Sequence, residues 1–237
     1  MPLASLNQLV FGGWDFFTDD MFAAATKCGV LDATLLAKVQ KELTAIKPMT
    51  PVYDENYIKN IKGVNPKKGK TKMALAEQVM ADIESFKKKN GCDRVVMLWC
   101  GSTERLPAPS KSHEDIESFE QGLRDNDPAI PPSMIYAYAA IKLGMAYGNG
   151  APNLSCDVPA LLELAEQTGS PICGKDFKTG QTLMKTTIAP MLKARMLALT
   201  GWYSTNILGN RDGEVLDDPG SFKSMRTLWW NLPYSSG

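Results

Sequence analysis

The run DRVVMLWC at residues 93–100 constrains the fold of this chain more than any other stretch. β-branched and apolar residues fill it, a charged segment precedes it, and the small polar residues GSTE follow it. This pattern is typical of a strand buried in a parallel sheet, whose carboxyl end faces a crevice where ligands bind. The run therefore predicts a buried parallel strand with a polar loop at its carboxyl end.

Helical and strand patterns alternate on both sides of this run. Residues 71–91 have apolar side chains at a spacing near 3.6, a lysine-rich last turn and an Asn90-Gly91 stop, which predict a helix that leads into the strand. Further helices are expected at 18–29, 31–43, 132–144 and 157–169, and further strands at 6–15, 145–147 and 170–176. The alternation predicts an α/β fold, and Pro131-Pro132 is the expected internal boundary.

The charge balance limits the kinds of partner that the chain can attract. Lysine plus arginine and aspartate plus glutamate both total 26, so no whole-chain field favours nucleic acid or an anionic membrane, and an anionic ligand needs a local site. No run approaches the roughly 20 apolar residues of a membrane span. The 5 cysteines lack CxxC spacing and favour free thiols, which predicts a cytoplasmic protein without a membrane segment.

Three polar loops follow predicted strands, and we expect them to share one crevice. They are GSTER at 101–105, NGAPN at 149–153 and GKDFKTGQT at 174–182. The third loop and the helix after it offer three cations, Lys175, Lys178 and Lys185, together with hydroxyls and the free amides of a helix start. This set favours a phosphorylated ligand. A solvated turn with ordinary helix capping is the alternative.

Other catalytic patterns are missing from the sequence. His113 is the single histidine, so no Ser/His/Asp triad, Cys/His pair or histidine metal cluster can be formed, and no metal site is predicted. No GxGxxG loop stands between a strand and a helix.

Five blocks of sequence, in order across about residues 7–224, resemble the inositol-3-phosphate synthase family. They are LVFGGWD, DRVVMLWCGSTER, PSMIYAYAAIKLGMAYGNGAPN, GKDFKTGQTLMK and NILGNRDG. The resemblance implies a partial Rossmann-like parallel sheet with helices on both faces, followed by the start of an α+β catalytic domain. The implied divisions are a partial NAD-binding domain at 1–131, a partial catalytic domain at 132–224 and an atypical tail at 225–237.

The resemblance also implies an activity and the residues that carry it. Family members use NAD to convert glucose 6-phosphate into inositol 3-phosphate by internal oxidation, enolisation, ring closure and reduction. By carry-over of the motifs, NAD is contacted by Asp15, Cys100, Gly101, Ser102, Thr103, Gly150, Ala151, Asp176, Thr179, Asn210, Arg211 and Asp212. Lys178, Lys185 and Asp176 take catalytic roles, in which lysines stabilise the phosphate and developing oxyanions. A complete member is expected to be a homo-oligomer.

The chain departs from the family pattern at several points. Lys175, Leu183 and Arg211 replace common family residues, and the family's glycine-rich turn is expected before residue 1. After Ser224 the family's lysine-rich motif gives way to MRTLWWNLPYSSG, which suggests a truncated gene. A non-catalytic NAD or sugar-phosphate binding fragment, or one subunit of a split synthase, is therefore the alternative function.

Overall fold

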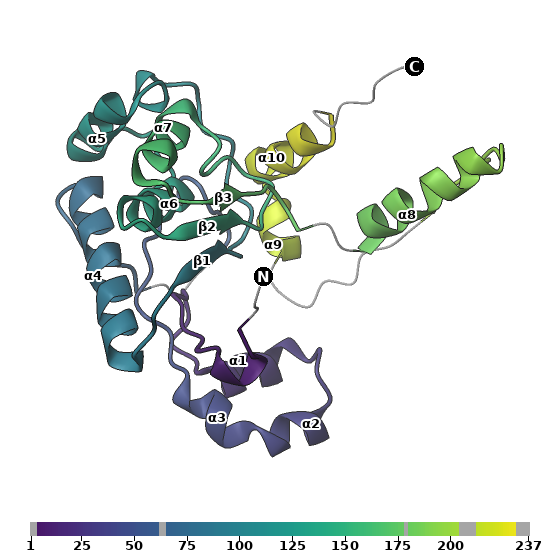
Figure 1. The fold of residues 1–237 in the computed structure, drawn as a ribbon, viewed down its shortest axis with the longest axis horizontal. Helices are drawn as coiled ribbons and strands as arrows, with labels where there is room; N and C mark the ends of the chain where they lie inside the picture. The colour runs from purple at the N-terminus through teal and green to yellow at the C-terminus, as the bar shows by residue number, and fades with distance from the viewer. Residues whose placement is uncertain (1–3, 62–64, 178–179, 204–211, 231–237) are drawn as a thin grey trace.

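The structure is a computed structural model that describes residues 4–61, 65–177, 180–203 and 212–230. Its centre is a parallel sheet of three strands in the order β1-β2-β3 (Figure 1). The strands are β1 (Val96–Trp99), β2 (Ala146–Asn149) and β3 (Ile172–Cys173). In the register of the sheet Met97 lies opposite Tyr147, and Tyr147 lies opposite Ile172. The predicted α/β class with a parallel sheet is confirmed.

Helices joined by loops make up the rest of the described chain. The α-helices are α1 (Met21–Cys28), α2 (Ala33–Lys38), α3 (Gln40–Ala45), α4 (Lys72–Asn90), α5 (Ile116–Asp125), α6 (Pro132–Lys142), α7 (Pro159–Thr168), α8 (Gly180–Ala194), α9 (Asp212–Leu216) and α10 (Pro219–Trp230). Two short 3₁₀ turns, η1 (Leu6–Gln8) and η2 (Lys111–His113), complete the set. Within the described residues no helix is both long and apolar enough to cross a membrane.

Local signals explain the ends of α4, the helix predicted at 71–91. The Thr71 side chain accepts a hydrogen bond from the Ala74 N–H at 3.1 Å, which caps the first turn. Gly91 ends the helix in the left-handed conformation with φ 62°. The buried positions Ala76, Val79 and Ile83 repeat at helical spacing and form the side that packs on the core.

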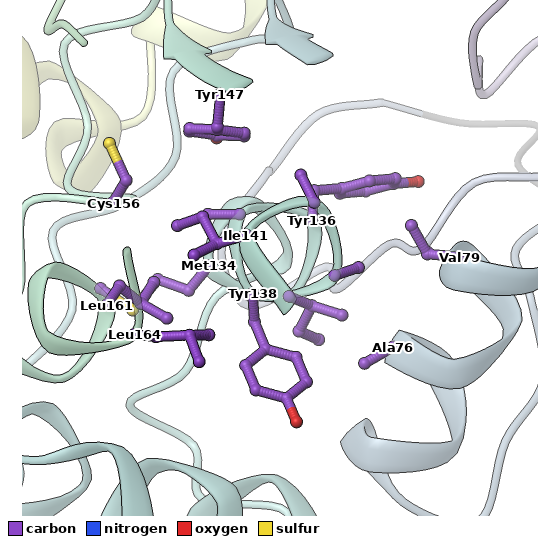
Figure 2. Packing of buried hydrophobic residues seen from close by; sticks show 14 of the residues in the cluster. Ala76, Val79, Met134, Tyr136, Tyr138, Ile141, Tyr147, Cys156, Leu161 and Leu164 are labelled. Atoms are coloured by element: carbon purple, nitrogen blue, oxygen red, sulfur yellow. The ribbon is translucent and has the colours of Figure 1, made fainter. Parts of the chain in front are cut away.

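The core surrounds α6, whose residues 132–141 are all buried. Figure 2 shows this helix end-on, with Ala76 and Val79 of α4 on one side, Leu161 and Leu164 of α7 on another, and Tyr147 of β2 above it. An apolar helix of this kind is expected where neighbours cover every face. The predicted boundary at 131–132 falls inside this core, since β1 and α4 precede it and β2, β3 and α7 follow it.

Helices cover one face of the sheet, although the prediction placed them on both. On β1, Met97 is buried beneath the helices, whereas Val96 is 61% exposed and Leu98 is 55% exposed on the opposite face. Cys173 of β3 is also exposed. The alternation in exposure follows from the period of two in a strand. Among the described residues, the second face of the sheet therefore presents apolar side chains to solvent.

The N-terminal segment differs from the strand predicted at 6–15. It contains η1 and a single parallel bridge between Trp14 and Met49. The Trp14 indole donates to the Asp82 carboxylate of α4 at 2.7 Å, so a side-chain contact fastens this segment. The helix predicted at 31–43 is likewise two helices, which break at Val39.

The C-terminal helices differ in how closely they approach the sheet. α8 projects away from the sheet, and α9 and α10 lie near β3 (Figure 1). α10 continues through Trp230, so the sequence predicted as an atypical tail begins in a helix.

Candidate cofactor site at the carboxyl edge of the sheet

Backbone hydrogen bonds bring the three predicted loops together at the carboxyl edge of the sheet. The Gly150 N–H donates to the Trp99 carbonyl at 2.8 Å, which joins the ends of β1 and β2. The Asp176 N–H donates to the Asn149 carbonyl at 3.1 Å, and the Phe177 N–H donates to the Gly150 carbonyl at 3.2 Å. The loops after β1, β2 and β3 are therefore immediate neighbours, as the sequence led us to expect.

The loop after β1 offers backbone donors to a ligand. Cys100 and Gly101 are exposed, Ser102 is half-buried and Thr103 is buried. The N–H groups of Gly101, Ser102 and Thr103 donate no hydrogen bond to the backbone of any described residue. Glycine is required at 101 because a Cβ there would lie 2.9 Å from the Trp99 ring. A loop whose N–H groups make no bond to the described backbone resembles the anion-binding concavities that loops form in other folds.

The loop after β2 is folded tightly around Asn149. The Asn149 side chain accepts from the Ala151 N–H at 3.0 Å and donates to the Asn153 carbonyl at 2.8 Å. A Cβ at Gly150 would lie 2.3 Å from the Phe177 ring, so this position needs glycine for the third loop to approach.

The first lysine of the loop after β3 is engaged in an ion pair at the surface. The Lys175 ammonium forms an ion pair with Asp157 at 2.9 Å. Asp176 is half-buried and has a left-handed backbone with φ 66°, a conformation that aspartate tolerates better than most residues. A Cβ at Gly174 would lie 2.8 Å from the Asn149 carbonyl, so the second and third loops are in close backbone contact.

Two other predicted residues that the structure describes, Asp15 and Lys185, lie outside this cluster of loops. Asp15 is exposed, and its carboxylate accepts from the Phe17 N–H at 3.0 Å. Lys185 lies on the projecting helix α8, with its ammonium 5.5 Å from the centre of the Trp202 ring. Four predicted residues, Lys178, Thr179, Asn210 and Arg211, lie outside the described residues, as does the side chain of Asp212.

One functional candidate was absent from the predicted set. Glu104 directly follows the predicted cofactor residues and is 0% exposed. Its carboxylate accepts from the Ser133 N–H at 2.9 Å and from the Asn153 side-chain amide at 3.2 Å. Burial raises the pKa of Glu104 to about 8, against the lowering effect of its hydrogen bonds from Ser133. The only sequence signal was an acidic residue at a strand end, which is too common to single out.

The described part of the chain contains no group of three or more His, Cys, Asp or Glu side chains placed to hold a metal ion. Its loops instead provide backbone donors and polar side chains at the end of a parallel sheet. This arrangement is typical of nucleotide and phosphate sites in α/β proteins.

Comparisons with known proteins agree with this arrangement. A family model of an NAD-binding domain, described as myo-inositol-1-phosphate synthase, matches residues 1–219. Inositol-3-phosphate synthase 1 of Bacteroides thetaiotaomicron is 51% identical over 225 residues, which are 94% of this chain and 52% of that protein. The inositol-3-phosphate synthase of Saccharomyces cerevisiae is 32% identical over 94% of this chain and 44% of its own length.

A solved structure extends the agreement to the fold. The crystal structure of inositol-3-phosphate synthase from Caenorhabditis elegans superposes with a TM-score of 0.87 and 30% identity, over 95% of this chain and 45% of that one. The chain thus spans about half the length of the relatives it matches. The match to the family model over nearly the whole chain, together with these relatives, shows that the protein belongs to the myo-inositol-1-phosphate synthase family.

Proposed function

We propose that this chain takes part in the NAD-dependent isomerisation and cyclisation of glucose 6-phosphate to inositol 3-phosphate. The observation that carries the proposal is the convergence of three polar loops at the carboxyl edge of the sheet, in a chain whose relatives are named inositol-3-phosphate synthases. The reaction needs a cofactor that oxidises and then reduces the sugar, and cations that hold its phosphate. Both requirements fit loops at the ends of parallel strands.

The residues at this edge fit NAD, the cofactor named by the family model. Residues 101–103 present backbone N–H groups that no described backbone group uses, and such donors suit pyrophosphate or ribose oxygens. Gly101 and Gly150 leave room where any side chain would collide with Trp99 or Phe177. When bound, NAD supplies the exchange of a hydride with the sugar. The roles of the other predicted contacts, from Asp15 to Asp212, belong to this proposal.

The protein's own cations would bind and stabilise the sugar phosphate. Lys175 is turned toward Asp157, so it is less available to substrate than its place in the motif suggests. We assign phosphate and oxyanion stabilisation to Lys178 and Lys185, and cofactor positioning or proton handling to Asp176. A cation directed at developing charge in a dry site contributes a rate factor on the order of 10² or more.

The test is conversion of glucose 6-phosphate by the full chain with added NAD, followed as inositol phosphate by chromatography. Lys185→Ala is expected to lower turnover about 100-fold. Lys193→Ala is the matched control, because Lys193 is an exposed lysine in the last turn of the same helix. Equal turnover in the two variants would remove the catalytic role from Lys185.

A second candidate is supported by the ion pair of Lys175 with Asp157, which already engages one cation of the candidate site. It is a non-catalytic NAD or sugar-phosphate binding fragment, or one subunit of a split synthase. Calorimetric titration with NAD and with glucose 6-phosphate separates the two candidates, because binding without conversion favours the second. A cytoplasmic location, homo-oligomeric assembly of a complete enzyme, the absence of a nucleic-acid partner and domains divided at 131–132 remain parts of the proposal.

A further inference from the structure

A buried carboxyl group lies behind the two loops that are expected to contact the cofactor. Glu104 and Ser133 are each 0% exposed, and Asn153 is 1% exposed. The Ser133 N–H donates to Glu104 Oε1 at 2.9 Å, and the Ser133 hydroxyl donates to Oε2 at 2.5 Å. The Asn153 amide donates to the same Oε2 at 3.2 Å. Three donors from two other segments therefore meet on one carboxyl group.

These bonds continue into the loop after β2. The Asn153 amide also donates to the Ser133 hydroxyl oxygen at 3.1 Å, and its backbone carbonyl accepts from the Asn149 side chain at 2.8 Å. Asn149 in turn accepts from the Ala151 N–H at 3.0 Å. An unbroken series of buried hydrogen bonds thus runs from the loop after β1 to the loop after β2.

A carboxyl group suits this position for a physical reason. An apolar side chain at 104 would remove the acceptor that the three buried donors share, and each buried polar group left unsatisfied is costly. Burial raises the pKa of Glu104 to about 8, so the group avoids most of the cost of a buried charge near neutral pH. The Asn153 side-chain oxygen has no hydrogen-bond partner among the described residues, but the bonds among Glu104, Ser133 and Asn153 hold these three side chains in one arrangement.

We propose that Glu104 is a positioning residue that locks the loop after β1 to the loop after β2, so that the cofactor meets both loops in one fixed arrangement. This inference rests on the proposed function, because residues 100–103 and 150–151 are its proposed cofactor contacts. Glu104 acts through Ser133 and Asn153 and need not touch the cofactor. Loops held in place before binding lose less freedom on binding, which strengthens the complex.

The test compares amide hydrogen exchange and NAD binding in the full chain and three variants. Asn153→Ala removes the side-chain amide that joins the loop after β2 to Glu104 and Ser133. Glu104→Ala removes the centre of the network. Ser155→Ala is the matched control, because Ser155 lies in the same loop, is 0% exposed and bonds to Tyr147 at 3.2 Å, outside the network.

A substitution in either loop is expected to speed amide exchange in the other loop. Asn153→Ala should speed exchange of the Arg105 N–H, which bonds to the Tyr57 carbonyl beside Glu104 at 2.9 Å. Glu104→Ala should speed exchange of the Gly150 and Ala151 N–H groups. Both variants should weaken NAD binding about tenfold, which corresponds to loss of one buried hydrogen bond. Ser155→Ala should leave the Arg105 N–H unchanged.

Two outcomes would overturn the inference. One is an exchange rate of the Arg105 N–H in Asn153→Ala that equals the rate in the unaltered chain. The other is a change in exchange rates in Ser155→Ala that is as large as the change in Asn153→Ala. If Glu104→Ala does not fold, Asn153→Ala and its control decide the matter alone. If the unaltered chain does not bind NAD, the proposed cofactor site fails, whereas the exchange rates still decide whether Glu104 couples the loops.

Discussion

At the scale of one residue, the surroundings of Glu104 favour the protonated form of a carboxyl group that is ordinarily ionised near neutral pH. Its pKa rises from 4.5 to about 8, chiefly through burial. Nearby Asp54 raises the pKa further, and the ammonium of Lys72 lowers it. Lys72 is itself held by the Asp127 and Ile130 carbonyls, each at 2.7 Å, so its charge is fixed in place.

This shift predicts a pH dependence of stability. Between about pH 5 and pH 8 the folded chain keeps the Glu104 proton, whereas the unfolded chain has released it. The free energy of unfolding should therefore fall as pH rises through this window, by a few kcal/mol at most. In Glu104→Gln the free energy of unfolding should fall less steeply with pH. Urea unfolding followed by circular dichroism at pH 5, 6, 7 and 8 measures the effect.

The control for this prediction is Glu166→Gln, which changes an exposed carboxylate on α7. In this variant the free energy of unfolding should fall with pH as steeply as in the unaltered chain. Identical slopes in all three proteins would mean that Glu104 titrates normally in the folded state.

At the scale of elements, a single carboxylate fastens the start of α10 to the β1 loop. Asp218 accepts from the Arg105 guanidinium through two hydrogen bonds, one of them at 2.8 Å, and from the Ser221 N–H at 2.9 Å. The Arg105 guanidinium holds the pKa of Asp218 well below its usual range. The Ser224 hydroxyl adds a bond to the Glu104 carbonyl at 2.7 Å. α10 is thus attached directly behind the candidate cofactor site.

Asp218→Asn should loosen this attachment. We expect a loss of about 1 kcal/mol in the free energy of unfolding at neutral pH, a modest value because the Arg105 side chain is 38% exposed. The stabilisation is present above the ordinary aspartate pKa and disappears as pH falls through the lowered one. Urea unfolding at pH 7 and at pH 3 should therefore show a difference at pH 7 that narrows at pH 3.

Asp217→Asn is the control, because Asp217 is the exposed neighbouring carboxylate. If the free energy of unfolding falls as much in this control, the negative charge near α10, rather than the bond to Arg105, causes the loss of stability.

At the scale of the whole molecule, the described residues leave one face of the sheet exposed. Val96 and Leu98 are exposed beside Cys173, and apolar residues on α8 such as Met191 are exposed as well. Large exposed apolar patches mark surfaces that associate with other polypeptides.

This exposure predicts strong binding of an apolar fluorescent dye by the folded chain. Replacing Val96 and Leu98 together by threonine puts a β-branched residue at both positions of the strand and should reduce dye fluorescence at least about twofold, since it removes exposed apolar surface of β1. Leu162→Thr, at a residue on α7 that is 43% exposed, is the control and should change the signal less. Equal reductions would show that the sheet face is not the main dye site.

The success of prediction from sequence depended on how local the deciding interactions were. The helix expected at 71–91 appears at 72–90, because its cap and its glycine stop act within one turn. The strand expected at 6–15 does not form: residues 6–8 are a 3₁₀ turn, and Trp14 makes a single bridge to Met49, a residue far along the chain. The three site loops were identified correctly as neighbours, since carboxyl ends of parallel strands always share an edge.

The sequence by itself determined the α/β class, the strand ends that form the site and the family, because periodicity, capping and motif order are properties of short stretches. Only the tertiary structure decided that Glu104 is buried among Ser133 and Asn153, that Lys175 pairs with Asp157, and that one face of the sheet is uncovered. Burial and hydrogen bonding between distant segments produce these features, and no local pattern encodes them.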